Sequence, residues 1–483
     1  MLTVYFFREG FVKNYLKNAV LLGTLFLVGC SSLIQKKESA SIIIKNGTIL
    51  TMDKNNNVIN NGVVVIKDNK IISVGNKNLL NTYSAPKIID AEEGIIMPGM
   101  INTHSHLPMI AFRGLGEEGI KNRLFAYFFP LEGEKLSRDL IYKATIHGSI
   151  DMALSGVTTY ADMYYHMDEM AKATKEIGIR GVLGETVIKF PVVDAKTPYG
   201  GIEYAVNFIE EYKNDELITP AFGPHAPYTV SKEKMQEITR LSEKYNVPVM
   251  IHVGEFDDED KRLNLKNRSV IEYMDSIGVL NSRVLLAHGI HLNEKDLDII
   301  KKRDAAIAYN PMANAKGATG IARTYEMLEK NIKVGLGTDG PMSSNQVDLF
   351  RTLSYASSMQ RLKYNDRTIM TPDIVVRMAT IGGAEALNLD SKIGSIESGK
   401  LADIIIVETK SSNMMPNYDP FATLVFQANS SNVDTTIVNG KVIVEDKKLK
   451  TYDIEKNRKQ MKAIEADIAE FAKGLAQKAK SMD

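Results

Sequence analysis

Eight short runs of β-forming residues, separated by stretches of helical character, fill the middle of the chain and constrain its fold more than any other feature. Strands that alternate with helices predict a parallel sheet, and eight is the number that closes such a sheet into a barrel. The length of 483 residues fits a barrel of about 250 residues with a smaller domain beside it. We therefore predict an α/β fold with a TIM-like (β/α)8 barrel. The candidate strands lie around residues 101–106, 158–163, 181–186, 219–224, 249–253, 284–288, 306–310 and 334–338.

Both ends of this middle segment are rich in β-branched runs and turn dipeptides. Asn46-Gly47 and Asn439-Gly440 each separate apolar runs, and Asn-Gly favours tight hairpins because both central residues of that turn need positive φ. We expect residues 41–97 and 396–452 to form one small β-sandwich beside a barrel spanning residues 98–395. An apolar stripe in residues 453–483 predicts a C-terminal helix that packs on one face, through Met461, Ile464, Ile468, Phe471 and Leu475.

The N-terminal segment has the pattern of an export signal. Lys13 and Lys17 precede an apolar run, residues 19–29, whose roughly 11 residues are too few to cross a bilayer. The run ends in Leu27-Val28-Gly29-Cys30, which resembles the lipobox of bacterial lipoproteins, where the cysteine is diacylated. This resemblance implies a signal peptide in residues 1–29, lipidation of Cys30 and a tether in residues 30–40. It also implies a lipid-anchored protein on the periplasmic or cell-surface side of a bacterial membrane. The alternative is a small buried cysteine near a short hydrophobic helix.

Basic and acidic residues balance, with 59 Lys plus Arg and 59 Asp plus Glu. A nucleic-acid-binding protein would carry a basic excess, so we expect no nucleic-acid partner. The balance favours a small, weakly charged substrate. The apolar fraction of 44% provides for a sizeable core and disfavours a disordered chain.

Histidines and one acid occur at the ends of several predicted strands. His104 and His106 are two apart on a strand and so point to the same side. His252, His288 and Asp339 close three further strands, and the carboxyl ends of barrel strands are where active residues gather. Unpaired buried ionisable groups are expensive, so packing alone does not account for this pattern.

The segments around these residues are similar to the amidohydrolase superfamily, and most similar to its branch of 5′-methylthioadenosine/S-adenosylhomocysteine deaminases and triazine hydrolases. The resemblance rests on the segments at residues 98–106, 252–255, 287–288, 337–340 and 394–403. It implies that one divalent metal, zinc or iron, is bound by His104, His106, His252 and Asp339. It also implies that Glu255 shuttles protons and that His288 orients the attacking water.

The donor set agrees with this assignment on physical grounds. Three neutral imidazoles and one carboxylate leave a divalent site with about one net positive charge, which brings the pKa of a bound water toward roughly 7. Glu255 lies three residues beyond His252 and reaches the same volume without being a ligand. It would take the water proton and later protonate the departing amine. The alternative is a solvated loop carboxylate in the acidic run that continues through residues 257–260.

The resemblance also implies three substrate contacts. Glu132 corresponds to the acid that bonds the ribose hydroxyls, a task suited to a carboxylate because it accepts two donors. His225 corresponds to a histidine that contacts the base, although a role as a supporting hydrogen-bond partner is an open alternative. Ser343 corresponds to a further substrate contact. An apolar wall for the ring is predicted from aromatic residues that would otherwise be core, namely Phe125, Phe128 and Phe129.

Two departures from family patterns narrow the chemistry. The predicted fourth strand ends Gly223-Pro224-His225 without the lysine that superfamily members with two metals carbamylate, so a single metal is expected. The arginines that resemble a clamp for the carboxylate of S-adenosylhomocysteine are absent, with Glu185 at the first position and no arginine in residues 186–203. Without that charge-assisted contact, neutral substrates are favoured: methylthioadenosine, 5′-deoxyadenosine or adenosine.

These observations predict a single-metal aminohydrolase that releases ammonia from an adenosine-like nucleoside. The alternatives are another C–N or C–halogen hydrolase on the same site, such as a guanine, pterin or cytosine deaminase, a triazine hydrolase or a cyclic amidase. A lipoprotein that binds a ligand without turnover is a further alternative. Barrels of this family often pair, so a homo-oligomer is also expected.

Overall fold

The computed structural model describes residues 37–117 and 119–482. Cys30, the predicted signal peptide and most of the predicted tether lie outside these residues. Among the described helices, none has both the length and the apolar character needed to cross a membrane.

Eight parallel strands form the predicted barrel and follow one another in chain order. All eight sequence-predicted strands are confirmed. Two hydrogen bonds join the first strand to Thr338, just after the last strand. One runs from Thr338 N to His104 O, 3.1 Å, and the other from Asn102 Nδ2 to Thr338 Oγ1, 2.8 Å. The strands are β8 (Met100–Ser105), β9 (Val157–Tyr164), β10 (Arg180–Val187), β11 (Ile218–Pro224), β12 (Val249–Val253), β13 (Val284–His288), β14 (Ala306–Tyr309) and β15 (Lys333–Leu336).

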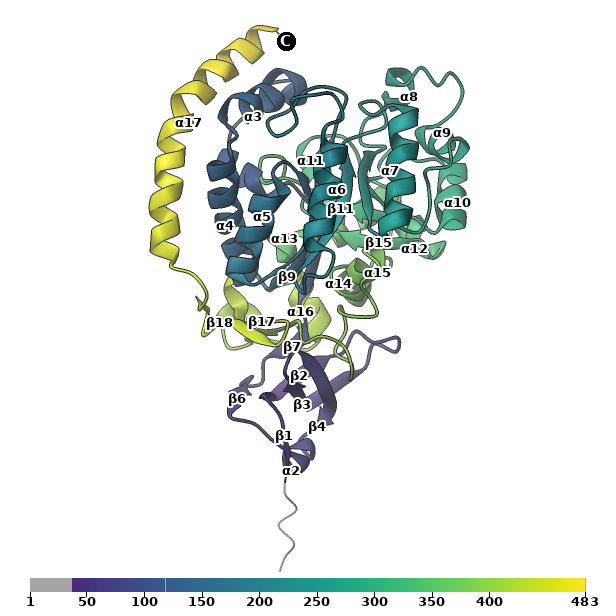
Figure 1. Ribbon diagram of the computed structural model, residues 1–483. Coiled ribbons are helices and arrows are strands. Elements are labelled where there is room, and N and C mark those ends of the chain that lie inside the picture. The colour runs from purple at the N-terminus through teal and green to yellow at the C-terminus, as the bar shows by residue number, and fades with distance from the viewer. Residues whose placement is uncertain (1–36, 118, 483) are drawn as a thin grey trace, which may run out of the picture.

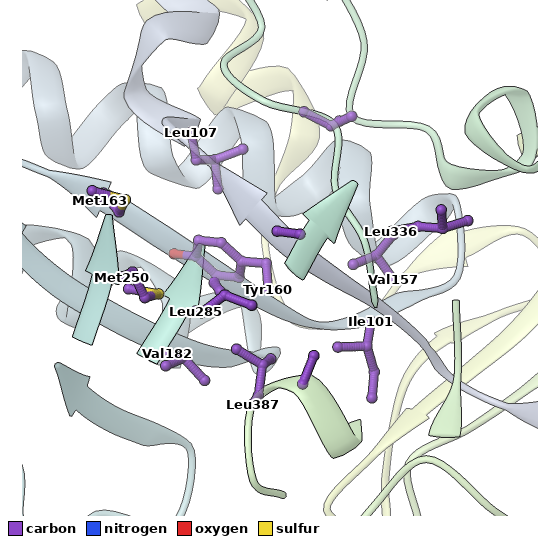
Figure 2. Packing of buried hydrophobic residues seen from close by; sticks show 14 of the residues in the cluster. Ile101, Leu107, Val157, Tyr160, Met163, Val182, Met250, Leu285, Leu336 and Leu387 are labelled. Atoms are coloured by element: carbon purple, nitrogen blue, oxygen red, sulfur yellow. The ribbon is translucent and has the colours of Figure 1, made fainter. Parts of the chain in front are cut away.

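Helices surround the strands (Figure 1), and apolar side chains fill the space within and around the barrel (Figure 2). Because the strands are covered on both faces, β9, β10 and β13 are buried along their whole length. The surrounding helices are α4 (Arg138–Leu154), α5 (Met167–Ile177), α6 (Gly201–Tyr212), α7 (Lys232–Tyr245), α9 (Val270–Ser276), α10 (Glu294–Arg303), α12 (Thr324–Glu329), α13 (Leu349–Tyr364), α14 (Pro372–Met378) and α15 (Ile381–Ala386).

Short helical segments lie in the loops that follow the strands, where the predicted site is located. They are the 3-10 helix η1 (Leu107–Phe112), the π-helix η2 (Leu124–Phe128), α3 (Phe129–Lys135), α8 (Glu259–Arg262) and α11 (Pro311–Lys316). The predicted C-terminal helix is confirmed as α17 (Ile454–Met482), which runs along the outside of α4 (Figure 1). Its stripe packs as expected, with Ile468 buried and Ile464, Phe471 and Leu475 partly buried against the barrel.

The smaller domain is one continuous nine-stranded sheet from both ends of the described chain. Ile71 and Ile437 share one buried cluster although their strands, β4 and β17, are far apart in the sheet, so the sheet curls around its own core. Its strands are β2 (Ile42–Leu50), β3 (Val58–Lys67), β4 (Lys70–Asn76), β6 (Lys87–Asp90), β7 (Ile95–Pro98), β16 (Ile404–Val407), β17 (Val433–Val438), β18 (Lys441–Glu445) and β19 (Lys448–Leu449).

The remaining elements of the two terminal segments lie outside this sheet. β1 (Glu38–Ser39) pairs with β5 (Tyr83–Ser84) and Ala40 is buried, so the last residues of the predicted tether belong to the folded part. Between β16 and β17, α16 (Pro420–Phe426) packs on α13 and α14 of the barrel rather than on the sheet. The other short helices are α2 (Leu79–Thr82), η3 (Ser412–Met414) and η4 (Ser430–Asn432).

One of the two Asn-Gly predictions is confirmed and one is wrong. Asn439 and Gly440 have φ of 50° and 74° and connect β17 to β18 as a hairpin. Asn46 also has a positive φ, 60°, but the chain continues within β2, and the pairing with β3 shifts register between Lys45 and Gly47. The dipeptide forms a β-bulge there, and a Cβ on Gly47 would lie 2.7 Å from the Ile96 side chain.

Candidate metal centre and active site

A cavity of about 380 Å³ lies at the carboxyl ends of the barrel strands. Side chains at or just beyond the ends of seven strands line it, from His106 after β8 to Asp339 after β15. This is the position where a barrel of this type carries its active site. The predicted site residues that line it are His106, Glu132, His225, His252, Glu255, His288, Asp339 and Ser343, together with Phe125, Phe128 and Phe129. His104 is 1% exposed and is not among the lining residues, but its ring lies 4.9 Å from that of His106, which lines the cavity.

Three histidines converge at one point, with a nitrogen from each of His104, His106 and His252 within 4.8 Å of the others. His106 Nδ1 donates to the Met163 carbonyl oxygen, 2.5 Å, and His252 Nδ1 donates to the His225 carbonyl oxygen, 2.7 Å. Each Nδ1 therefore carries the proton, and the two Nε2 lone pairs face each other across 3.1 Å. Two lone pairs this close repel each other, and a cation bound between them would remove the repulsion.

Asp339 adds a carboxylate to this group. Its Oδ1 lies 3.7 Å from Nε2 of His104 and 3.6 Å from Nε2 of His106. His104 Nε2 is buried and has no hydrogen-bond partner among the described residues. A buried polar atom without a partner is costly, and coordination of a metal would satisfy it.

The backbone is strained where it places two of these groups. Asp339 has a backbone φ of 59° and His288, at the end of β13, has a φ of 77°, values that residues other than glycine rarely adopt. Such conformations cost about 1–3 kcal/mol each and gather at functional sites. The space around them is also tight, because a Cβ on Gly337 would lie 2.2 Å from Asn310 Oδ1.

The electrostatics of the histidines suit a metal centre. Burial lowers the pKa of His104 and His252 well below the usual value, and the neighbouring imidazoles add to this effect. Burial also lowers the pKa of His106, although Asp339 opposes the shift. The three rings are therefore neutral at neutral pH, which is the form that binds a metal. The donor set and its protonation state fit a divalent cation.

Glu255 and His288 form a second group on the cavity wall. Burial raises the pKa of Glu255, His288 opposes the shift and Asp339 adds to it, so that the pKa is raised to about 7. Burial alone would lower the pKa of His288, but the carboxylates of Glu255 and Asp339 outweigh it and raise the value. His288 Nδ1 lies 3.0 Å from Oδ1 of Asn314, which fixes the orientation of the ring.

Glu259 holds the loop that carries Glu255. Its carboxylate accepts hydrogen bonds from the backbone nitrogens of Gly254, Glu255 and Phe256, at 2.8, 2.8 and 3.3 Å. Glu259 belongs to the acidic run that the sequence presents as solvated, yet it is 3% exposed. Sequence reasoning missed this residue and also Asn314. In the sequence, Glu259 is marked only by being an acidic residue four positions after Glu255.

The expected substrate contacts occupy different parts of the cavity wall. Glu132 is 4% exposed and accepts a hydrogen bond from Tyr164 Oη, 2.5 Å. Burial raises its pKa to about 7 although this bond opposes the shift. His225 bonds to Thr229 Oγ1 through Nδ1, 2.9 Å, while its backbone oxygen supports His252. Ser343 also lines the cavity, and its backbone oxygen accepts from Lys316 Nζ, 2.9 Å.

Comparison with known proteins identifies the family of this chain. Residues 95–443 match the sequence profile of the amidohydrolase family. The 5-methylthioadenosine/S-adenosylhomocysteine deaminase 1 of Syntrophus aciditrophicus is 33% identical over 439 residues, which are 90% of this chain and 99% of that protein. The 5′-deoxyadenosine deaminase of Methanobrevibacter smithii is 38% identical over 410 residues, 84% of this chain and 93% of that protein.

A solved structure extends the comparison to the fold. The adenosine deaminase from Xanthomonas campestris with bound zinc superposes with a TM-score of 0.88 at 24% identity, covering 90% of this chain and 99% of that chain. This likeness shows that the barrel and the curled sheet are a shared architecture. From its sequence profile and its relatives, the chain belongs to the amidohydrolase family.

Proposed function

We propose that the protein is a single-metal aminohydrolase that converts an adenosine-like nucleoside to its inosine form and ammonia. The observation that carries the proposal is the convergence in one cavity of three neutral histidines, Asp339 and the Glu255–His288 pair. The names of the relatives described above support an adenosine-like substrate.

His104, His106, His252 and Asp339 are the residues that would hold the metal. When bound there, a divalent cation would act as a Lewis acid and lower the pKa of water so that it attacks the ring at neutral pH. Zinc is our first choice and iron the alternative, because three imidazoles and one carboxylate suit either.

Glu255 moves the protons in the proposed reaction. A carboxyl whose pKa is about 7 can accept a proton and return it at the same pH. Its carboxylate takes one proton from the attacking water and passes it to a ring nitrogen. It then takes the second proton of the water, from the hydroxyl now on the ring, and gives it to the amine as the amine leaves. The water oxygen becomes the new carbonyl oxygen and the amine departs as ammonia, so the atoms balance. His288 orients the water, and Asn314 holds His288 in place.

The rest of the cavity would bind the nucleoside. Glu132 has one carboxylate oxygen bonded to Tyr164, which leaves the other for ribose hydroxyls. His225 and Ser343 would contact the base and the rest of the substrate, and Phe125, Phe128 and Phe129 supply the apolar wall. We favour methylthioadenosine, 5′-deoxyadenosine or adenosine as the substrate.

We further propose that Cys30 is lipidated and that the enzyme acts outside the cytoplasm, anchored to a bacterial membrane. This rests on the lipobox-like segment ending at Cys30. Recovery of the full-length protein in the cytosolic fraction with an unmodified Cys30 would contradict it. A homo-oligomer and the absence of a nucleic-acid partner remain predictions from the sequence.

The test is a substrate screen on metal-reconstituted protein. Ammonia release is measured with purine nucleosides, free purines, pyrimidines, pterins and aminotriazines, followed by metal analysis of the active fraction. We expect release from adenosine-like nucleosides, and release slower by about 10² or more from Glu255→Gln protein with the same metal content. Chloride release from a triazine, or ring opening of a cyclic amide, without ammonia from any amine would replace this proposal with another hydrolase reaction.

A further inference from the structure

Two carboxyl groups, one buried and one partly buried, meet beside the cavity and take no part in the proposed chemistry. Glu185 is in β10 and is fully buried, and Asp194 is in the following loop, residues 188–200. Both bind the start of α5. Asp194 Oδ2 accepts from His166 N, 2.6 Å, and Glu185 Oε2 accepts from the next amide, Met167 N, 3.3 Å. Two acids are thus anchored on successive backbone amides.

Each carboxyl group has a second oxygen without a donor. Glu185 Oε1 and Asp194 Oδ1 are both buried and find no hydrogen-bond donor among the described residues. Two ionised carboxylates in this setting would repel each other, because these two oxygens are shielded from water. A single proton between them removes the repulsion and satisfies both oxygens. Burial, and then the neighbouring carboxyl of Asp194, raise the pKa of Glu185 well above its usual value.

The charged and titratable groups around the pair do not supply a counter-charge. Arg138 of α4 is engaged by Asp168 and Glu169 at the start of α5. Burial lowers the pKa of His166, which favours its neutral form. Burial raises the pKa of two tyrosines, Tyr165 after β9 and Tyr204 of α6, which are also close enough for Glu185 to add to this rise, and neither carries a positive charge. A shared proton is therefore the simplest way to neutralise the pair.

The pair connects a cavity-wall loop to the barrel. Asp194 is in a turn closed by Val192 N and Ala195 O, 2.9 Å apart. The same loop carries Phe190, whose ring lies 5.8 Å from that of Phe129 in the cavity wall. It also carries Lys189, whose backbone nitrogen bonds to Thr229 O, 3.0 Å.

Thr229 leads from this loop to a substrate contact. Its hydroxyl bonds to His225 Nδ1 at 2.9 Å, and His225 lines the cavity. Phe129 is also close to this histidine, with 5.8 Å between the ring centroids. The position of the loop therefore sets the position of the wall that faces the substrate.

We propose that Glu185 and Asp194 share one proton, that this proton fastens the 188–200 loop, and that Glu185 is thereby a positioning residue for substrate binding. The effect on binding rests on the proposed function, whereas the fastening of the loop does not. Loss of the proton at alkaline pH separates the two like charges and loosens the wall, so affinity falls as pH rises.

The decisive variant is Glu185→Gln, whose amide donates the hydrogen bond at every pH. We expect its KM at pH 7 to match that of the wild type. Its KM should not rise toward alkaline pH, where the KM of the wild type rises. Glu185→Leu, which has no donor, should raise KM about fivefold or more at pH 7 with a smaller effect on kcat. Glu176→Gln, an exposed acid on α5, is the matched control and should behave as the wild type.

Hydrogen exchange of the 188–200 loop and of the His166 and Met167 amides tests the fastening without any activity. The wild type and Glu185→Gln should be protected, and Glu185→Leu should exchange at least about tenfold faster. Asp194→Asn also places a hydrogen-bond donor between the two side chains and should keep the protection. It provides the test if Glu185→Leu does not fold, because faster exchange in Asp194→Asn would contradict the shared hydrogen bond.

Two results would overturn the shared proton. One is faster exchange in Glu185→Gln, equal to that of Glu185→Leu. The other is a rise in unfolding temperature with Na⁺, Ca²⁺ or Mg²⁺ in the wild type but not in Glu185→Gln, which would show that a cation joins the carboxylates. If hydrogen exchange follows the expected pattern but the protein deaminates no nucleoside, the fastening of the loop stands and only the proposed function is rejected.

Discussion

Nε2 of His288 lies 3.9 Å from Oε2 of Glu255, across the part of the cavity next to the three clustered histidines. The imidazole is fixed by Asn314 on its far side, and the backbone that carries Glu255 is fixed by Glu259. Both groups are thus held by supporting hydrogen bonds, a preorganisation that proton transfer requires.

Replacing Glu255 with Gln should lower kcat/KM by about 10² to 10⁴, the usual contribution of a positioned acid–base group. The amide keeps the shape of the side chain but cannot cycle a proton. Steady-state kinetics with metal analysis provide the measurement, and the metal content should not change. The matched control is Asp257→Asn, an exposed acid of the same loop, which should keep full activity. Full activity in Glu255→Gln would remove the proposed shuttle.

Removing the metal should lower stability as well as activity. The neutral imidazoles of His104, His106 and His252 gather their lone pairs at one point, and only a cation satisfies all of them. Zn²⁺ at about 100 times its Kd should stabilise the folded state by about 2.7 kcal/mol, measured as a rise in unfolding temperature after chelation and reconstitution. Equal unfolding temperatures with and without the ion would count against the site. His291→Gln, outside the cluster, should preserve the rise.

Nucleoside affinity should depend on the ionisation of Glu132. Its pKa is raised to about 7 by burial, so the carboxyl is protonated below that pH and ionised above it. The ionised form accepts two ribose hydroxyls, and KM should therefore fall as pH rises through about 7. Glu132→Gln should raise KM about tenfold and flatten this dependence, because a neutral amide accepts more weakly. A 2′,3′-dideoxy substrate should show the same KM with both proteins. A fall in KM through about pH 7 that is retained in Glu132→Gln would assign this ionisation to another group.

The junction between barrel and sheet depends on a buried ion pair. Arg180 of β10 donates to Asp403 through Nε, 3.0 Å, and Nη2, 3.3 Å, and both side chains are nearly inaccessible. Arg180→Met leaves a buried carboxylate unpaired and should cost about 3–5 kcal/mol in chemical denaturation. Arg113→Met, which breaks a more exposed pair with Asp151, should cost about 1 kcal/mol or less. Similar losses in the two variants would contradict a structural role for the buried pair.

The barrel could be predicted from the sequence because its signals are local. Each strand is a short apolar run, and the chemistry-bearing residues follow at its carboxyl end, as with His252 after Val249 to Ile251. The two Asn-Gly dipeptides show where local signals fail. Both asparagines adopt positive φ, as the dipeptide predicts. Whether the chain reverses or continues is decided by pairing, and at Asn46 the long partner strand β3 and the nearby Ile96 favour a bulge.

The supporting groups of the site could not be predicted, because their partners are distant or are backbone atoms. Asn314 meets His288 only once β13 and the segment after β14 are side by side. Glu259 binds three amides whose directions exist only after the loop at Gly254 has formed. The departure at Glu185 was visible in the sequence, but its pairing with Asp194 required the fold.

The curled sheet can be completed only after the last part of the chain has been synthesised. β7 is made early, yet one of its two neighbours, β16, is translated only after the entire barrel. Until then one side of an apolar strand stays unpaired, which is a known route to aggregation for nascent chains. A ribosome-bound intermediate that stops before Ile404 should therefore need a chaperone, and release of the last segment should end that requirement.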